Sequence, residues 1–571
     1  MTKQWIFRGI TLAIPILFFA ILEFALRIAG VGESKPLFIE NPAHKDYILP
    51  RPDVMARYFP AKAKIPSVTL EANFLLKQKP KDGIRIFVQG GSTAAGYPYG
   101  LGASLAGMLD HRLKRSLPNH HVEVVNTALS AVNSFTLLDL ADEIIEQQPD
   151  AILIYAGHNE YLGILGVGSS FTLGSSFWVT RSMLWLKDLR LYQLLQNTIF
   201  ALSTSATETS ANQNQNKRTV MSQVAKHKAI DFQSDLFNAG VKQFENNLAA
   251  LLNKYRDAGI PVFIATLASN YRDHSPFNSA AIPAEIATSL SQALSSEKLA
   301  QLSSSSLSVQ SADLHFEIGQ RFLQAGNAQL AAKHYELAKE YDLLRFRAPE
   351  AMNQVIREAS SSKHVYLVDV KERMQQRSEA GIIGKNLMLE HLHPNVEGYF
   401  LLADTFYQAI KNSAVFEPFN EISINQAWRD RPLLPAEEYY GFASVLTLVS
   451  DYPFTESPQP VKLPPPTDWQ QVLGKQRFSK QIDWLTMARE SAQRYQKTNN
   501  APMWVKTLQL IADALPHDPL ANIRVGELLM KQKRYSEAKY YLQRAKRAGT
   551  VSKELDAQIV LAINMAKQTA L

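Results

Sequence analysis

The chain has 571 residues, of which 46% are hydrophobic and 20% charged, as is typical of a globular protein with about two or three domains. Its formal net charge of +7 comes from 60 basic and 53 acidic residues that are spread thinly, and no basic run interleaved with aromatic residues indicates a nucleic-acid partner. Because the sequence has no cysteine, disulfides, thiolate catalysis and thiolate metal sites are excluded.

The amino-terminal residues 1–32 predict a membrane anchor. Lys3 and Arg8 precede an apolar run over residues 10–28, which has about the 20 residues that a bilayer-spanning helix needs. A cleaved signal peptide shares this layout, but no small-x-small cleavage site follows the run, so we expect the anchor to stay attached. Positive charge ahead of the run keeps that end in the cytoplasm and places everything after residue 30 across the membrane.

Residues 33–82 contain scattered prolines and little periodicity, and we interpret them as an extended connector. From residue 83 to 455 the sequence alternates between continuous apolar runs and helix patterns, which predicts an α/β domain with a parallel sheet and helices on both faces. The predicted strands are residues 84–88, 121–129, 151–157, 261–270 and 365–370, and the predicted helices are residues 103–116, 134–147, 233–258 and 396–410.

Two segments between the third and fourth predicted strands differ in composition from the rest of this domain. Residues 164–203 are rich in leucine and aromatic residues, and they either line a pocket or form a helical hairpin packed on the domain. Residues 203–217 are polar and low in complexity, which is typical of a mobile loop.

Two stretches resemble tetratricopeptide repeats, in which paired helices approach each other at small residues. The first lies in a helical insertion over about residues 283–350, and the second lies near the end of the chain. A Pro-rich segment at 456–466 is interpreted as a stiff linker that makes residues 467–571 a separate all-α domain. One or two repeats cannot bury their own faces, so each is expected to pack on the main domain or on a protein partner. The matching positions are Gly319, Phe322, Ala331, Tyr335 and Ala338, and then Gly526, Leu529, Ala538, Leu542 and Ala545.

A serine follows the first predicted strand of the α/β domain directly. Gly90 and Gly91 end the strand, and Ser92 stands outside its carboxyl end, where ligands bind in open α/β sheets. Ser92 is therefore a candidate nucleophile. The alternative is a strand-to-helix turn that uses glycine and serine only for their conformations.

Three further stretches lie at the same predicted edge: NTALSAVNS at 126–134, GHNEY at 157–161 and EHLHPN at 390–395. With Ser92 they supply an asparagine amide and a carboxylate three residues before a histidine, which are the parts of a serine hydrolase. A histidine must remove the serine proton, a carboxylate must orient the imidazole, and donors must meet the developing oxyanion. Glu390 and His393 lie within one turn, so the carboxylate can reach the imidazole locally.

In this order and on this sheet, the four stretches resemble the SGNH (GDSL-like) hydrolase superfamily, over about residues 83–162 and 261–413. The resemblance implies a flavodoxin-like, three-layer α/β/α fold with a five-stranded parallel sheet, and it implies no metal or cofactor. The roles that it implies are Ser92 as nucleophile, His393 as general base, Glu390 as the acid that orients His393, and the N–H groups of Ser92 and Ala131 with the amide of Asn159 as oxyanion hole.

The sequence departs from the family pattern in three places. The first motif reads GGS where the family often has GDS, Ala131 stands at a glycine position, and Glu390 replaces an aspartate. Ala131 keeps the N–H that an oxyanion hole needs, but its Cβ restricts the loop. The extra methylene of Glu390 moves the carboxylate relative to His393.

The substrate-binding residues that we expect around this edge are Gly91, Tyr97, His158, Tyr161 and Arg345. Each has a structural alternative, since the tyrosines can cap the sheet and the arginine can end the repeat with exposed charge. His391 is an alternative base, but its spacing from Glu390 fits worse than that of His393. A metal at His158 is not predicted, because no second ligand cluster lies at metal spacing.

These patterns together predict a serine ester hydrolase that needs no metal or cofactor. With its anchor and repeats, the chain resembles bacterial repeat-containing SGNH hydrolases, which implies a catalytic domain on the periplasmic side of the inner membrane. That location favours acyl groups, such as O-acetyl, on envelope glycans or lipids. The alternatives are an O-acyltransferase with the same triad and an inactive envelope scaffold that works through its repeats. The expected partners are the acylated substrate, the membrane and a protein bound by the repeats, but not nucleic acid.

Overall fold

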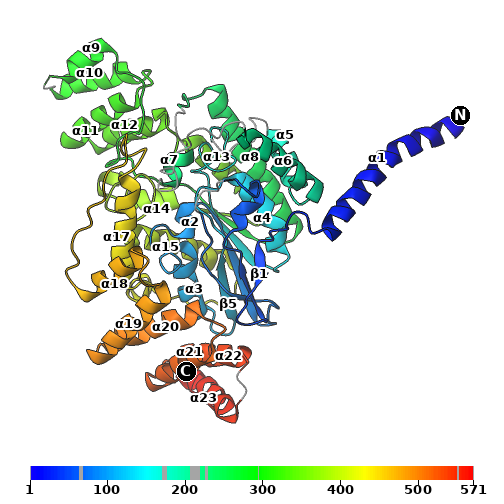
Figure 1. Ribbon diagram of the computed structural model, residues 1–571. Helices are drawn as coiled ribbons and strands as arrows, with labels where there is room; N and C mark the ends of the chain where they lie inside the picture. The colour runs from blue at the N-terminus through cyan, green and yellow to red at the C-terminus, as the bar shows by residue number, and fades with distance from the viewer. Residues whose placement is uncertain are drawn as a thin grey trace.

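The computed structural model describes residues 2–63, 68–169, 177–205, 219–224, 229–292, 295–549 and 552–569. A five-stranded sheet lies at the centre, helices cover both of its faces, and smaller helical units extend from it (Figure 1). The amino-terminal helix projects away from this body, and the carboxyl-terminal helices lie at one end of it (Figure 1).

All neighbouring strands of the central sheet are parallel, in the flavodoxin-like order β5-β4-β6-β7-β8, which confirms the predicted five-stranded parallel sheet. The strand that precedes Ser92 therefore lies between the two strands that precede the NTALS and GHNEY motifs. Apolar side chains on both of its faces are fully buried, as a sheet covered on both sides requires. The strands are β4 (Gly83–Gly90), β5 (His121–Asn126), β6 (Ala151–Tyr155), β7 (Val262–Ala265) and β8 (Val365–Val368).

Helices form one layer on each face of the sheet. Side-chain caps set where they begin: Ser104 Oγ accepts from the Gly107 N–H at 3.0 Å, and Asn395 Oδ1 accepts from the Gly398 N–H at 2.9 Å. The second cap starts a helix directly after the histidine motif and so fixes the position of that motif. One layer contains α3 (Leu105–Ser116), α14 (Val370–Arg377), the short turn η3 (Glu379–Gly381) and α15 (Val396–Ser413), and the other contains α4 (Ser134–Ile145), α8 (Asp235–Asp257) and α13 (Glu350–Ala359).

Residues 33–82 are not the extended connector that we expected. They form a small antiparallel sheet in the order β1-β2-β3, and Leu37, Val54 and Leu75 are buried in the same core as the central sheet. The strands have only two to four residues and the prolines interrupt them, so no period of two appears in the sequence. The elements are β1 (Phe38–Glu40), β2 (Tyr47–Pro50), η1 (Val54–Tyr58) and β3 (Leu75–Leu76).

The aromatic and leucine-rich segment forms a helical hairpin of α5 (Phe177–Leu186) and α6 (Arg190–Ser205). The described part of residues 164–203 is thus mainly helical, as the second alternative expected, and residues 170–176 lie outside the described residues. Of the polar segment 203–217, the first three residues end α6 and the rest lie outside the described residues.

Paired helices occur at both positions where the sequence resembles tetratricopeptide repeats. A Cβ on Gly319 would lie 3.1 Å from the Tyr335 ring, and one on Gly526 would lie 2.6 Å from Leu542, so each glycine allows its helix pair to approach closely. The assignment to that repeat family stays a prediction. The insertion contains α9 (Ala284–Leu290), α10 (Ser296–Ser306), α11 (Ala312–Gln324) and α12 (Ala328–Tyr341).

The carboxyl-terminal helices contact the α/β domain and also have hydrophobic cores of their own. That residues 467–571 form a separate domain stays a prediction. The Tyr540 hydroxyl donates to the Val122 carbonyl of β5 at 3.2 Å, and Lys114 of α3 pairs with Asp513 at 3.3 Å. The prolines stiffen the linker but do not decide whether the segments on either side of it pack together. These helices are α16 (Ile424–Asp430), α17 (Pro435–Val449), α18 (Trp469–Phe478), α19 (Trp484–Lys497), α20 (Ala501–Ala514), α21 (Pro519–Lys531), α22 (Tyr535–Arg547) and α23 (Lys553–Thr569).

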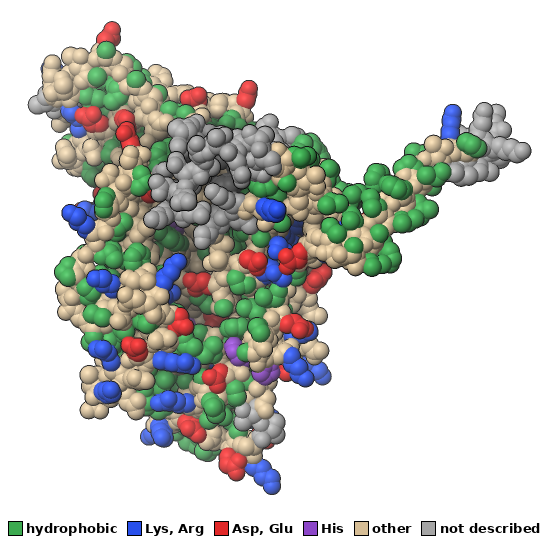
Figure 2. All heavy atoms as spheres, in the orientation of Figure 1, with side chains coloured by type: hydrophobic (Ala, Val, Ile, Leu, Met, Phe, Trp, Pro, Cys, Tyr) green, Lys and Arg blue, Asp and Glu red, His purple; other side chains and the backbone are tan. Residues whose placement is uncertain are grey.

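Among the described residues, one helix is long and apolar enough to cross a membrane. This helix is α1 (Thr2–Ile28), and its apolar part, Thr11–Ile28, is not buried against the rest of the protein. Hydrophobic side chains cover α1 in the space-filling view (Figure 2). A signal sequence has the same length and composition.

Candidate active site

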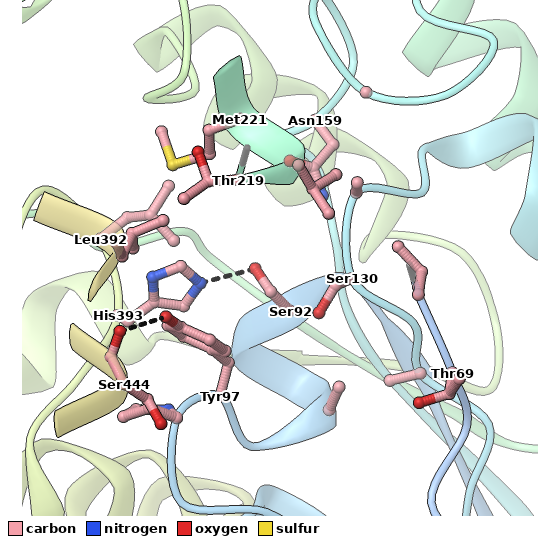
Figure 3. Close-up of a pocket in the computed structure, with 18 of the residues that line it drawn as sticks. Thr69, Ser92, Tyr97, Ser130, Asn159, Thr219, Met221, Leu392, His393 and Ser444 are labelled. Atoms are coloured by element: carbon pink, nitrogen blue, oxygen red, sulfur yellow. Dashed lines mark hydrogen bonds between the residues drawn. The ribbon is translucent and has the colours of Figure 1, made fainter. Parts of the chain in front are cut away.

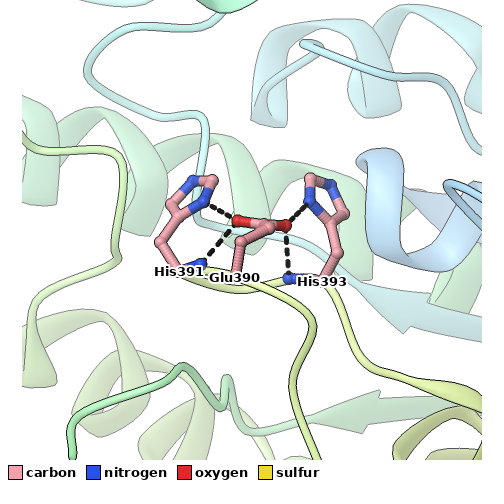
Figure 4. Close-up of side chains that lie close together, drawn as sticks. All are labelled: Glu390, His391 and His393. Atoms are coloured by element: carbon pink, nitrogen blue, oxygen red, sulfur yellow. Dashed lines mark hydrogen bonds and ion pairs between the residues drawn. The ribbon is translucent and has the colours of Figure 1, made fainter. Parts of the chain in front are cut away.

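Three side chains from two distant parts of the chain meet at the carboxyl end of β4. Ser92 begins the short helix α2 (Ser92–Ala95), and His393 lies in the loop before α15. The Nε2 atom of His393 lies 2.7 Å from the Ser92 Oγ (Figure 3), and its Nδ1 atom contacts Oε1 of Glu390 (Figure 4). In this order the imidazole can accept the serine proton while the carboxylate holds the ring.

The Glu390 carboxylate contacts two imidazoles, with Oε1 on His393 and Oε2 on His391 (Figure 4). It also accepts backbone N–H groups, from His393 at 3.0 Å and from Leu392 at 3.3 Å. Burial alone would raise the pKa of Glu390, but the interactions with the two histidines outweigh burial and hold this pKa well below its ordinary value. Glu390 is therefore an ionised acceptor at neutral pH.

His391 is enclosed by the rings of Phe277, Phe346 and Phe454. Burial lowers the pKa of His391, so its ring is neutral at pH 7 and its Nδ1–H donates to Glu390. The ligand atoms of Glu390, His391 and His393 lie within 4.8 Å of one another, which a metal ion would also require. Because both Nδ1 atoms face a carboxylate oxygen directly, the arrangement fits hydrogen bonds between the groups better than a cation between them.

Two loops after the neighbouring strands face Ser92. Asn159 follows β6, and its Nδ2 lies 2.8 Å from the point where a Cβ on Gly91 would stand, so glycine leaves the amide room beside Ser92. Ala131 follows β5 with a φ of 61°, a left-handed conformation that glycine adopts more easily than alanine. The Ala131 carbonyl accepts from the Ile164 N–H at 2.7 Å, which helps to hold this loop in place.

If the site hydrolyses esters and Asn159 is an oxyanion donor, as the sequence predicts, replacing Gly91 with alanine should lower kcat about 10- to 100-fold, because the new Cβ would displace the Asn159 amide. Asn159→Ala alone should lower kcat about 100- to 1,000-fold. If the glycine acts through the amide, adding Gly91→Ala to Asn159→Ala should cost little more. Steady-state kinetics of the two single variants and the double variant test this. A loss of kcat in the double variant equal to the product of the two single losses would contradict it.

The triad opens into a cavity of about 440 Å³ (Figure 3). Tyr97 forms the wall beside the triad: its ring lies 4.7 Å from the His393 ring, centroid to centroid, and its hydroxyl donates to the Ser444 carbonyl at 3.2 Å. Three segments that the sequence patterns did not assign to the site also line the cavity. They are residues 68–71, residues 219–221 with the start of α7 (Val220–Val224), and residues 440–448 of α17.

Proline at the start of α17 and two acidic residues in its first turn are a usable sequence signal for that helix. They do not predict that α17 reaches the cavity, which depends on packing between residues more than 300 positions apart, such as Tyr97 and Ser444. Residues 68–71 and 219–221 are too short to show any pattern.

Of the five expected substrate contacts, Tyr97 lines the cavity, Gly91 does not, and the other three lie inside the domain, which corrects the sequence-based expectation. The Tyr161 side chain is buried, and its hydroxyl donates to the Phe237 carbonyl at 3.0 Å. The buried Arg345 donates from Nε to the Ile230 carbonyl at 2.8 Å. His158 accepts from the Ala348 N–H at 3.2 Å, and burial lowers its pKa to about 3. Because all three are held by backbone groups inside the domain, they serve its packing.

No family model matches the chain, and no curated protein matches it. Among solved structures, the chain is similar to TesA, at 13% identity over 57% of this chain and 98% of that chain, with a TM-score of 0.27. The chain is also similar to the acetyl xylan esterase AlAXEase, at 12% identity over 57% of this chain and 100% of that chain, with a TM-score of 0.27. A third similar structure is a GDSL-like lipase from Bacteroides thetaiotaomicron, at 11% identity over 59% of this chain and 93% of that chain, with a TM-score of 0.26. At such low TM-scores, the chemistry of the site has to be judged from its geometry.

Proposed function

We propose that this protein is a serine ester hydrolase of the SGNH type. The observation that carries the proposal is the 2.7 Å contact between Ser92 Oγ and His393 Nε2, with a buried carboxylate on the other ring nitrogen and a cavity in front of the serine. The same geometry argues against a scaffold that has lost catalysis, because such a protein has no need to keep the serine and the imidazole in contact.

The geometry supports a two-step acyl transfer. Ser92 Oγ attacks the acyl carbonyl carbon while His393 Nε2 takes its proton, and the carbonyl oxygen becomes an oxyanion near the Asn159 amide and the N–H groups of Ser92 and Ala131. Collapse of this intermediate breaks the ester C–O bond, and the imidazolium returns the proton to the leaving alcohol. Water then attacks the acyl-serine with the same base, which releases the acid and restores Ser92.

A second hollow supports an extended substrate such as an acylated glycan. Its volume is about 470 Å³, and Glu71 lines both this hollow and the catalytic cavity. Aromatic rings of Phe74 and Trp484 lie in its wall beside the polar side chains of Arg477 and Asp483. Rings next to charged and hydrogen-bonding groups suit a sugar, which presents an apolar ring face and many hydroxyls. We propose that α1 spans the membrane, which would put the site in the envelope, where acylated glycans occur.

The adjoining hollow also favours a second candidate, an O-acyltransferase in which a sugar hydroxyl replaces water as the attacking group. Such an enzyme forms the same acyl-serine, but its product is a new ester. The hollow that meets the catalytic cavity at Glu71 is where an acceptor sugar would lie.

Labelling with a fluorophosphonate followed by peptide mass spectrometry tests the shared step. We expect the phosphonyl group on Ser92 and no labelling of protein that carries His393→Ala. Labelling of another serine, or none, would contradict the proposal. Incubation with an activated acetyl ester and an oligosaccharide acceptor then separates the two candidates, because a hydrolase releases acetate and a transferase yields acetylated acceptor.

A further inference from the structure

Large apolar side chains are exposed on both helices of the α5–α6 hairpin, and we call these side chains its outer face. The exposed fraction is 72% for Trp178 and 79% for Trp185 on α5, and it is 57% for Leu195, 58% for Ile199 and 70% for Leu202 on α6. The α6 residues are spaced four and three apart, so they form one stripe along the helix. A contiguous apolar face of this kind on a folded protein marks a contact surface.

α5 and the turn after it are attached to the α/β domain, while α6 packs beside α1. Thr180 is buried, the Phe177 ring lies 5.6 Å from the Phe135 ring of α4, and Lys187 Nζ pairs with Asp139 of α4 at 2.8 Å. The outer face is therefore exposed although α5 itself is packed on the α/β domain. A surface that binds this face would also fix the orientation of the α/β domain relative to that surface.

The hairpin is also bound to the carboxyl-terminal end of α1. The Glu23 carboxylate accepts the backbone N–H groups of Arg190 and Leu191, both at 3.0 Å, at the start of α6. Arg27 donates to the Asp188 carbonyl at 3.2 Å in the turn of the hairpin. Glu23 and Arg27 lie on the last turns of the apolar part of α1. At a rise of about 1.5 Å per residue, both are within about 8 Å of its end at Ile28. The hairpin thus lies at the level where α1 would leave the bilayer.

We infer that the outer face of the α5–α6 hairpin is a second membrane contact, lying in the interface of the bilayer that α1 spans. Exposed tryptophans favour the headgroup level, and aliphatic side chains at the same depth reach the acyl chains. The exposed Arg181 on α5 can meet lipid phosphates. A bilayer is the occupant, and not a second copy of the chain, because α6, which carries part of this face, packs beside the exposed apolar helix α1. This inference rests on the proposed membrane placement of α1.

The absence of native cysteine makes a single-label test direct. Full-length protein in nanodiscs of phosphatidylethanolamine and phosphatidylglycerol would carry one cysteine with an environment-sensitive fluorophore, as Leu195→Cys, Leu17→Cys or Val560→Cys. Leu17 lies in α1, and Val560 on α23 has the same 57% exposure as Leu195 but lies in the carboxyl-terminal helices. Lipids that carry a nitroxide near the glycerol end or near the middle of the acyl chain then quench labels at the interface or in the bilayer core, respectively, and the mid-span Leu17 label is read with the second lipid.

We expect quenching of the Leu195 label to exceed that of the Val560 label several-fold. If the Leu17 label is quenched and the Leu195 label behaves like Val560, the hairpin inference fails while the anchor stands. If neither the Leu17 nor the Leu195 label is quenched, both the anchor and the hairpin contact are wrong. Protection of the Leu195 label from a water-soluble quencher without quenching by lipid would show that protein covers this face and would also overturn the inference.

Discussion

Ser92→Ala is expected to lower kcat/KM for an activated acetyl ester by about 10⁴-fold or more, and His393→Ala should have nearly the same effect. The two side chains form one unit, since the imidazole 2.7 Å from the hydroxyl has no proton to take once the oxygen is gone. Combining the substitutions should therefore add little to either loss. Stopped assays with a chromogenic acetyl ester, on protein whose melting temperature is unchanged, measure the effect.

Ser130 provides the matched comparison for Ser92. Its hydroxyl lies near Ser92 in the same cavity (Figure 3), but it has no imidazole beside it in the close-up. Ser130→Ala should keep fluorophosphonate labelling at Ser92 and most of the activity. If Ser130→Ala abolished the labelling and Ser92→Ala kept full activity, the nucleophile would be Ser130 and not Ser92.

The position of the candidate triad could be predicted because parallel strands constrain their carboxyl ends. Continuous apolar runs predicted each strand, and the order of the strands places the residues after β4, β5 and β6 side by side. Ser92, Asn159 and Ala131 therefore had to lie close together once the sheet formed. His393 could be added because the EHLHPN motif directly precedes the last predicted helix, which begins at the same edge of the sheet.

The remainder of the site depends on contacts that no local pattern contains. Tyr97 closes the cavity only because its hydroxyl reaches the Ser444 carbonyl on α17, which comes far later in the chain. Tyr161 and Arg345 were expected at the substrate because they neighbour the motifs, but their polar atoms are held by the backbone of Phe237 and Ile230. Proximity in sequence does not determine which way a side chain points.

The role of His391 could not be predicted for a related reason. Its spacing from Glu390 made it an inferior candidate base, and spacing alone gives no other role. The structure shows that its ring and the His393 ring contact different oxygens of one carboxylate (Figure 4). Glu390, which is longer than the aspartate of the family pattern, thus has a second imidazole, that of His391, in contact with its Oε2 atom.

The second large effect is expected from Glu390. Glu390→Gln should lower kcat about 10³- to 10⁴-fold with little change in KM, because the amide removes the negative charge that stabilises the imidazolium and cannot accept from both rings. The folded pKa of Glu390 is below its unfolded value near 4.5, so its contribution to the free energy of unfolding is complete above pH 4.5 and is lost as pH falls through the folded pKa. Glu390→Gln should remove this part of the acid sensitivity, which thermal melts between neutral and acidic pH would measure.

His391 variants separate orientation of the carboxylate from its charge. His391→Phe should fit among Phe277, Phe346 and Phe454 but leaves Oε2 without its imidazole donor, so we expect kcat to fall about tenfold, KM to stay unchanged and the pKa of Glu390 to rise. His391→Asn restores an N–H near the position of Nδ1 and should recover most of the rate. Equal rates for both variants would mean that the backbone N–H groups of Leu392 and His393 suffice to hold the carboxylate. A loss in His391→Phe that asparagine rescues would instead show that Glu390 orients His393 only while a second imidazole holds its other oxygen.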